Sequence, residues 1–173
     1  MPALLMRPVR DDDEPFLREL RTQVDAERLG LHYWSPESED LARKIIELQY
    51  RAHAGHFRRL KSGWDTKDCI IEVDGRPVGR FIVTQDGKTI HLAEIAVHQA
   101  HRGKGIGQAV IEGTKAECVQ SKRVLRLHVD PLNPALQFYL QLGFQLMEQL
   151  PAYLLMEWRP PNLGRKTIVT SMK

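Results

Sequence analysis

The chain has 173 residues, of which 42% are hydrophobic and 27% are charged, and this composition excludes a disordered or fibrous protein. Its net charge of +3 does not indicate a nucleic-acid-binding surface on the domain, because the excess lies in the last 14 residues. Without Arg165, Lys166 and Lys173 of this segment, the 25 basic residues fall to 22, which equals the number of acidic residues. We therefore expect one domain over residues 1–159, a flexible basic tail over residues 160–173, and no nucleic-acid partner.

Nothing in the sequence indicates export or membrane insertion. The apolar runs are too short for a membrane-spanning helix, and no apolar segment follows a basic start as it would in a signal peptide. Cys69 and Cys118 lie far apart and lack the spacing of metal ligands. We expect reduced thiols, no metal, no membrane partner and a cytoplasmic location.

The first part of the chain is expected to hold one strand and two helices. Residues 4–8 form the strand, and the acidic run at residues 11–14 followed by Pro15 favours a capped helix start. This helix runs to about Leu29. Apolar residues at helical spacing predict a second helix, with the stripe Leu41, Ile45, Leu48 and Ala52.

The hydrophobic period then changes to two, which predicts three strands with two tight Asp-Gly turns, at residues 69–73, 78–84 and 89–97. A helix follows, with the apolar stripe Ile106, Ala109, Val110, Gly113 and Ala116. A strand, a helix and an antiparallel strand pair complete the chain, at residues 124–129, 133–142, 144–150 and 153–158. The order β-αα-βββ-α-β-α-ββ predicts an α/β fold whose twisted mixed sheet has about seven strands and helices on both faces.

Three glycines, Gly103, Gly105 and Gly107, lie where a strand ends and a helix begins. Glycine lets several N–H groups point into one concavity, and the helix N-terminus adds a partial positive charge. Arg102 and Lys104 add full charges. The pattern is typical of a pyrophosphate-binding turn, although glycines that serve only close packing would look the same. It fits neither the nucleoside-triphosphate nor the dinucleotide spacing.

Residues 95–107 resemble the acetyl-CoA signature R/Q-x-x-G-x-G/A of the GNAT N-acetyltransferase superfamily, with the preceding strand. Asn133, Tyr139 and Gly143-Phe144 resemble its second signature, with one residue fewer between Asn133 and Tyr139. The element order is similar over about residues 3–159. The resemblance implies a cytoplasmic, acetyl-CoA-dependent enzyme that acetylates a primary amine of a small molecule or peptide by direct attack, in a family where homodimers are common.

The resemblance also implies roles for single residues. Backbone groups of the strand end would pair with the pantetheine arm, those of the glycine turn would hold the pyrophosphate, and Asn133 would hydrogen-bond the pantetheine. Tyr139 would lie near the sulfur and protonate the leaving thiolate as general acid. The implied coenzyme-binding residues are Ile95, Ala96, Val97, Arg102, Gly103, Lys104, Gly105, Ile106, Gly107, Asn133 and Tyr139.

Three residues compete for the role of general base, which helps because the attacking amine must be unprotonated. Glu94 is a carboxylate in an apolar strand, where desolvation raises its pKa. His128 lies on the polar face of the strand at residues 124–129. His91 lies three residues before Glu94, and so on the opposite face of a regular strand. We favour Glu94, then His128, then His91, although each can instead be a solvated structural residue.

The acceptor is not identified by the sequence. Gln49, Tyr50, His53 and His56 lie on the expected second helix and could line an acceptor pocket, or form the exposed face of an amphipathic helix. Two other functions stay open. One is a coenzyme A-binding domain without catalysis, acting as a sensor or interaction module; the other is nucleic-acid binding through the basic tail.

Overall fold

The computed structural model describes residues 3–28, 30, 35–38, 40–45 and 65–164. These residues form two compact units, which we describe separately. The first comprises the described residues up to Ile82 together with Glu94–Gly107, and the second comprises Val83–Ala93 and the described residues from Gln108 onward.

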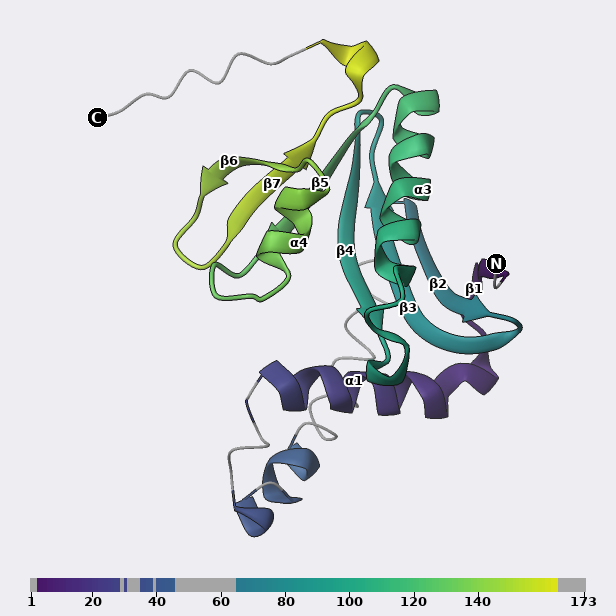
Figure 1. Cartoon of the computed structure of the whole chain (residues 1–173), viewed down its shortest axis with the longest axis vertical. Helices are drawn as coiled ribbons and strands as arrows, with labels where there is room; N and C mark the ends of the chain where they lie inside the picture. Colours follow the sequence, from purple (N-terminus) through teal and green to yellow (C-terminus); the bar gives the residue numbers. More distant parts are fainter. Residues whose placement is uncertain (1–2, 29, 31–34, 39, 46–64, 165–173) are drawn as a thin grey trace. The chain divides into compact units, whose positions relative to one another are not determined.

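A seven-stranded mixed sheet runs through the described residues, in the order β1-β2-β3-β4-β5-β7-β6 (Figure 1). Its strands are β1 (Leu4–Pro8), β2 (Asp65–Val73), β3 (Arg76–Gln85), β4 (Thr89–Val97), β5 (Val124–Val129), β6 (Gln145–Gln149) and β7 (Leu154–Trp158). β1 and β2 are antiparallel, as are β5 and β7, and β6 and β7, whereas β4 and β5 are parallel. The expected mixed α/β sheet is confirmed.

The two strands β4 and β5 pair over only part of their length. Their register runs from Thr89 opposite Val124 to Leu92 opposite Leu127. β4 then continues to Val97, while β5 stays paired with β7 to its end at Val129. The boundary between the two units falls in β4 at this point, after Ala93.

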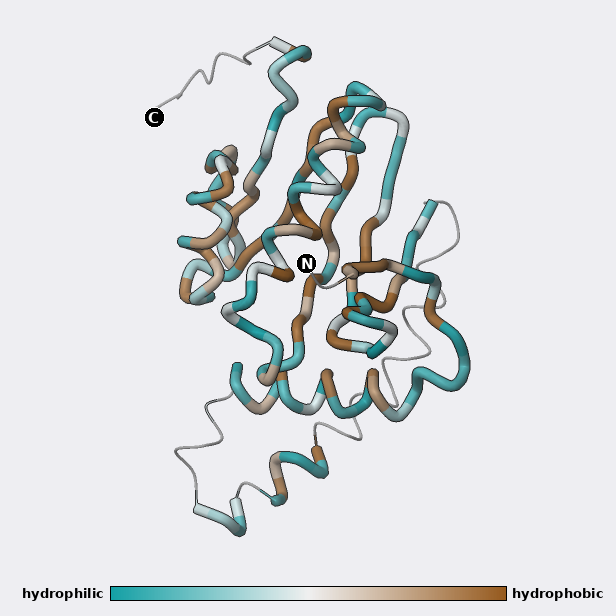
Figure 2. Tube along the Cα trace, turned by 45° about the vertical axis from the view of Figure 1, so that its right-hand side comes forward, coloured by the Kyte–Doolittle hydropathy of each residue, from teal (hydrophilic) through white to brown (hydrophobic). Residues whose placement is uncertain are grey.

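In the first unit, a short 3-10 turn (Asp11–Asp13) leads into α1 (Glu14–Arg28). Hydrophobic residues recur along α1 about once per helical turn (Figure 2). Of these, Leu17, Leu20 and Ala26 are buried. Ala26 forms a small cluster with Ala42, in the helical segment at residues 40–45.

In that helical segment, the apolar stripe predicted for the second helix is partly wrong. Leu41 and Ile45 were expected on its buried stripe, but both are exposed, and Ala42 is buried in their place. The small side chain of Ala42 allows close packing against Ala26, which the spacing of the larger residues did not indicate. Leu48 and Ala52 lie outside the described residues.

A buried ion-pair cluster ties β1 to β2 and to the start of α1. The guanidinium of Arg7 donates two hydrogen bonds to Asp13, both of 2.7 Å, and one to Glu72, of 2.6 Å. Asp13 also accepts from the N–H of Arg10. The N-cap is therefore Arg10 and not a residue of the acidic run; Asp13 supports the helix start by bonding back to the N–H of Arg10, and it also belongs to the ion-pair cluster.

The helix α3 (Ile106–Ser121), which belongs to the second unit from Gln108 onward, buries a different face from the expected one. Val110 is buried as expected, but Ala109, Gly113 and Ala116 are exposed. The buried face instead holds Ile111, Thr114, Lys115 and Cys118. The prediction failed because small residues define a helix face poorly. The buried polar residues of α3 have hydrogen-bond partners: Thr114 donates to the carbonyl of Val110, and the partners of Lys115 are described below.

Two local predictions also need correction. The Asp74-Gly75 turn has φ of +50° and +74°, as a tight hairpin turn requires. The Asp86-Gly87 turn is instead a three-residue loop, in which the Asp86 carboxylate accepts from the N–H groups of Lys88 and Thr89. α4 spans only Leu136–Gln141. It starts later than expected because Asn133 accepts from the N–H of Ala135 in a turn.

Candidate functional site

The junction between β4 and α3 has the backbone geometry of an anion-binding turn. A 3-10 turn (Gln99–His101) follows β4, and Gly103 and Gly105 then have φ of +71° and +75°. A side chain at either position would meet no atom within 4 Å, so the left-handed backbone, and not lack of space, is what requires glycine there. Left-handed residues alternating with others gather successive N–H groups into a concavity that binds anions.

One of the N–H groups expected to hold the pyrophosphate already has a partner within the chain. The N–H of Arg102 already donates to the carbonyl of Gln99, at 3.2 Å. Within the described part of the chain, the N–H groups of Gly103 and Gly105 donate to no backbone carbonyl. Those of Ile106 and Gly107 open α3, whose first turn carries no acidic residue, so the helix dipole adds to the attraction for an anion.

The two cations of the turn bond to its own backbone. Arg102 Nε donates to the carbonyl of Val97, at 2.8 Å, and Lys104 Nζ donates to the carbonyl of Ala100, at 3.0 Å. Arg102 also forms an ion pair with Glu27 of α1, at 2.7 Å. Both side chains therefore contribute to the shape of the turn as well as to its charge.

The end of β4, which was expected to grip the pantetheine arm, is shaped by a glycine of β3. A Cβ on Gly79 would overlap the carbonyl oxygen of Ala96. The N–H of His98 donates to the carbonyl of Val78, at 2.8 Å. The missing side chain at position 79 thus lets the backbone of β4 lie close against β3, directly before the turn.

Glu94 is largely buried on β4, in the first unit. Desolvation raises the pKa of its carboxyl above the ordinary value, against the opposing effect of Arg80 and Arg21. Arg21 lies 3.7 Å from Glu94 and 2.7 Å from Asp25, and Arg80 is held by two hydrogen bonds to Asp68. The expected desolvation of this carboxylate is confirmed, and the environment favours a proton-accepting group.

The two histidines considered as bases belong to the second unit. His91 lies 3.8 Å from Asp86, and desolvation, with Arg126 and His128, lowers its pKa against the opposing effect of Asp86. His128 is exposed on β5, while its neighbours Leu127 and Val129 are buried. The expected two faces of this strand are confirmed, with His128 on the exposed face.

Tyr139 is carried by α4 and packs between two aromatic rings. Phe138 and Phe144 contact it edge-on, with ring centroids at 5.4 Å and 5.7 Å. Burial raises the pKa of Tyr139 to about 12. The hydroxyl is therefore protonated at neutral pH, but it is a weaker acid than the ordinary value near 10 suggests. Asn133 lies in the turn before α4, where its side-chain oxygen accepts from Ala135.

Lys115, which the sequence did not single out, anchors the end of α4. Its ammonium donates to the carbonyl of Leu142, at 2.5 Å, and to Glu112, at 2.7 Å. It also lies over the rings of Phe144 and Trp158, at 5.4–5.9 Å. The helix that holds Tyr139 is thereby fixed at its C-terminal end. A lysine within an amphipathic helix gives no signal that distinguishes it from a solvated one.

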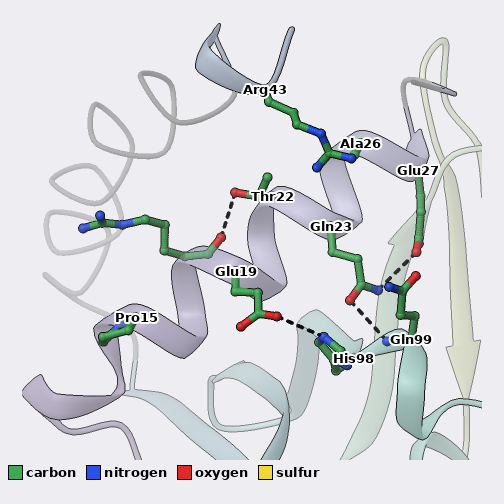
Figure 3. Close-up of a pocket in the computed structure, with 10 residues that line it drawn as sticks. Pro15, Glu19, Thr22, Gln23, Ala26, Glu27, Arg43, His98 and Gln99 are labelled. Carbon is green, nitrogen blue, oxygen red and sulfur yellow. Dashed lines mark hydrogen bonds and ion pairs between the residues drawn. The ribbon is translucent and has the colours of Figure 1, made fainter. Parts of the chain in front are cut away.

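A surface pocket of about 680 Å³ lies in the first unit beside the end of β4 (Figure 3). It is lined by one face of α1 together with three residues from other segments, Arg43, His98 and Gln99. Its polar residues on α1 include Glu19, Gln23 and Glu27, whose four-residue spacing in the sequence could have indicated a common face. Gln49, Tyr50, His53 and His56, expected near an acceptor, lie outside the described residues.

Neither a metal-binding cluster nor a membrane-spanning helix is present in the parts of the chain that the structure describes. No group of three or more His, Cys, Asp or Glu side chains is placed to hold a metal ion there. No helix among the described residues has the length and apolar character needed to cross a membrane.

Comparisons with known proteins point to one family. A family model described as an acetyltransferase (GNAT) domain matches residues 65–146. An uncharacterised N-acetyltransferase of Methanocaldococcus jannaschii is 30% identical over 114 residues, which cover 58% of this chain and 71% of that protein. A mycothiol acetyltransferase of Clavibacter michiganensis is 32% identical over 101 residues, which cover 53% of this chain but only 33% of that protein.

The fold is shared with solved structures at low sequence identity. A PaiA N-acetyltransferase from Thermoplasma acidophilum, solved in complex with coenzyme A, aligns with a TM-score of 0.67 and 16% identity, covering 91% of this chain and 99% of that chain. An acetyltransferase from Thermus thermophilus aligns with a TM-score of 0.65 and 17% identity, over 91% of this chain and 97% of that one.

Proposed function

The chain belongs to the GNAT acetyltransferase family, and from this premise we propose that it is an acetyl-CoA-dependent N-acetyltransferase that acetylates a primary amine. One observation carries the proposal: the pair of left-handed glycines, Gly103 and Gly105, at the N-terminus of α3. Their arrangement fits a pyrophosphate, because it offers several N–H groups and a helix dipole to one anion. Coenzyme A carries such a pyrophosphate, and the Thermoplasma relative binds it.

The end of β4 fits the rest of the coenzyme. A strand edge offers N–H and carbonyl groups to an extended amide-containing chain, and β4 is not paired with β5 beyond Leu92. The backbone of Ile95, Ala96 and Val97 would receive the pantetheine arm there. When bound, acetyl-CoA would supply an activated acetyl group as a thioester, and the N–H of Val97 would stabilise negative charge on its carbonyl oxygen.

Tyr139 is proposed as the general acid. Its raised pKa keeps the hydroxyl protonated, so a proton is available for the thiolate as the carbon–sulfur bond breaks and the carbon–nitrogen bond forms. With the pKa at about 12, transfer to a thiolate of pKa near 10 is uphill by roughly 2–3 kcal/mol. Tyr139 is therefore effective only where the sulfur lies within hydrogen-bond distance of its hydroxyl.

Glu94 is proposed as the general base, acting directly or through one water molecule. Its raised pKa and its burial near two arginines support this role over the exposed His128. The base takes the proton that the amine loses during attack. Arg80 and Arg21 favour the charged carboxylate and so oppose the effect of desolvation on its pKa.

A panel of amines tests the proposal. Purified protein is incubated with acetyl-CoA and small amines, amino acids or peptides, and the release of free coenzyme A is followed. Transfer to at least one primary amine supports the proposal. Tyr139→Phe should then lose most of its turnover while it still binds acetyl-CoA. Binding by the wild type without any transfer would instead indicate the alternative, a non-catalytic acyl-CoA sensor.

A cytoplasmic location is part of the proposal and is supported by the two free thiols, Cys69 and Cys118.

A further inference from the structure

Three polar residues of α1 form a row that contacts the segment after β4. Glu19, Gln23 and Glu27 lie four residues apart, and therefore on one face of the helix. Figure 3 shows Glu19 and Gln23 directed at His98 and at the backbone of Gln99. Glu19 lies 3.5 Å from His98 Nε2, and Gln23 Oε1 accepts from the N–H of Gln99, at 3.2 Å.

Glu27 ends this row, and both its carboxylate oxygens are used. Oε1 accepts from Gln23 Nε2, at 3.1 Å, and Oε2 accepts from Arg102 Nη1, at 2.7 Å. The same guanidinium donates through Nε to the carbonyl of Val97, at 2.8 Å. Arg102 therefore links Val97, the last residue of β4, to Glu27 of α1. The forked guanidinium allows both contacts at once, which a lysine would not.

The glycines that carry the anion site follow Arg102 directly. Gly103 and Gly105 have no side chains with which to hold their left-handed backbone in place. The conformation of this stretch consequently depends on the residues around the glycines: α3 follows it, Lys104 bonds to the carbonyl of Ala100, and Arg102 precedes it. Arg102 has its guanidinium directed back to Val97 and Glu27, so its contribution to the site in this arrangement is to the shape of the turn.

We infer that Glu27 is a positioning residue for coenzyme A binding: it acts through Arg102 to hold the N–H groups of the glycine turn in the arrangement that receives the pyrophosphate. The inference rests on the proposed function and deepens it. The side chains of Arg102 and Glu27 are 43% and 41% exposed, and such a pair adds little to the free energy of unfolding. Its loss should therefore act on coenzyme binding and leave the melting temperature nearly unchanged.

The test is a double-mutant cycle on the affinity for coenzyme A, measured by calorimetry with the full chain. Glu27→Gln and Arg102→Met should each raise the Kd about five- to twentyfold, the equivalent of losing one charged hydrogen bond. The double variant should bind no more weakly than Arg102→Met alone, because Glu27 acts only through Arg102. In turnover with saturating amine, Glu27→Gln should raise the KM for acetyl-CoA and leave kcat within about twofold.

Glu14→Gln is the matched control, since Glu14 forms an exposed ion pair with Arg18 on the same helix but outside the row; its Kd should equal that of the wild type. An unchanged Kd for Glu27→Gln, a tighter one, or additive effects in the double variant would overturn the inference. If Glu27→Gln does not fold, Arg102→Lys replaces it, because lysine cannot bond to Val97 and Glu27 together; its Kd for coenzyme A should rise in the same way. Wild-type protein that binds no coenzyme A at all would instead refute the proposed function itself.

Discussion

The carbonyl oxygen of Ala96 lies closer than van der Waals contact to the point where a β-carbon would stand at position 79, so any residue other than glycine would clash there. Gly79 is on β3, and Ala96 is the middle one of the three β4 residues whose backbone would receive the pantetheine arm. The close approach of the two strands thus shapes the proposed coenzyme site as well as the core.

Gly79→Ala is expected to weaken both the fold and coenzyme binding. The new methyl group would have to displace the carbonyl of Ala96, because the overlap is with backbone that cannot rotate away. Overpacking of this kind costs roughly 1–3 kcal/mol, which thermal unfolding would report, and the Kd for coenzyme A should rise. Gly87→Ala, where a Cβ meets nothing within 4 Å, is the control and should change neither quantity.

Glu94→Gln separates catalysis from stability. Because burial raises the pKa of Glu94, the folded protein holds the proton more tightly than the unfolded chain, so this residue destabilises the fold increasingly as the pH rises through the folded-state pKa. The variant should therefore be at least as stable as the wild type at pH 7. Its kcat should fall about 10²–10⁴-fold, and the acidic limb of the pH profile of kcat/KM should disappear. A variant with an unaltered profile would exclude Glu94 as the base.

Arg7→Met is expected to be severely destabilising without touching the proposed site. It leaves the carboxylates of Asp13 and Glu72, which are only 5% and 12% exposed, without their shared cation, and breaking a buried ion pair costs about 3–5 kcal/mol. The hydrogen bonds from Arg7 lower the pKa of Asp13. This stabilisation is present above the ordinary pKa and is lost as the pH falls through the folded-state value, so the acid sensitivity of unfolding should diminish in the variant.

Denaturant unfolding between pH 3 and pH 7 measures both effects. Lys44→Met is the control, because Lys44 and Asp40 form an ion pair of the same kind with side chains 67% and 65% exposed. It should change the free energy of unfolding by less than about 1 kcal/mol. Equal losses in the two variants would show that the Arg7 cluster contributes no more than a surface pair.

Lys115→Met is expected to lower kcat through the position of Tyr139. The substitution keeps the volume but leaves the carbonyl of Leu142 without its buried donor, which costs roughly 1–3 kcal/mol. The end of α4 would then be held less firmly, so turnover should fall more than the affinity for coenzyme A. Lys88→Met, at an exposed loop position, should alter neither. Full turnover in Lys115→Met would mean that α4 needs no anchor at Leu142.

The sequence predicted most of the strands because period-two hydrophobicity and Asp-Gly turns are local signals. The β5 strand was predicted to the residue, and the glycine turn before α3 was located from three glycines alone. The buried face of α3 was predicted wrongly, because Ala109, Gly113 and Ala116 are too small to define a face and the buried Lys115 resembles a surface residue in sequence. Glu27 and Arg102 are 75 positions apart in the sequence, and Gly79 and Ala96 are 17 positions apart. No local sequence pattern predicts contacts over such separations.

The central claim is that the glycine turn between β4 and α3 holds the pyrophosphate of coenzyme A. Its most direct test is a calorimetric titration of coenzyme A into the wild type and into Gly103→Ala and Gly105→Ala, with thermal unfolding to confirm that each variant is folded. A methyl group at a left-handed position strains the backbone by about 1–2 kcal/mol, so the account predicts saturable binding that weakens about tenfold in each variant. No heat with the wild type at millimolar coenzyme A, or the same Kd in all three proteins, would contradict it.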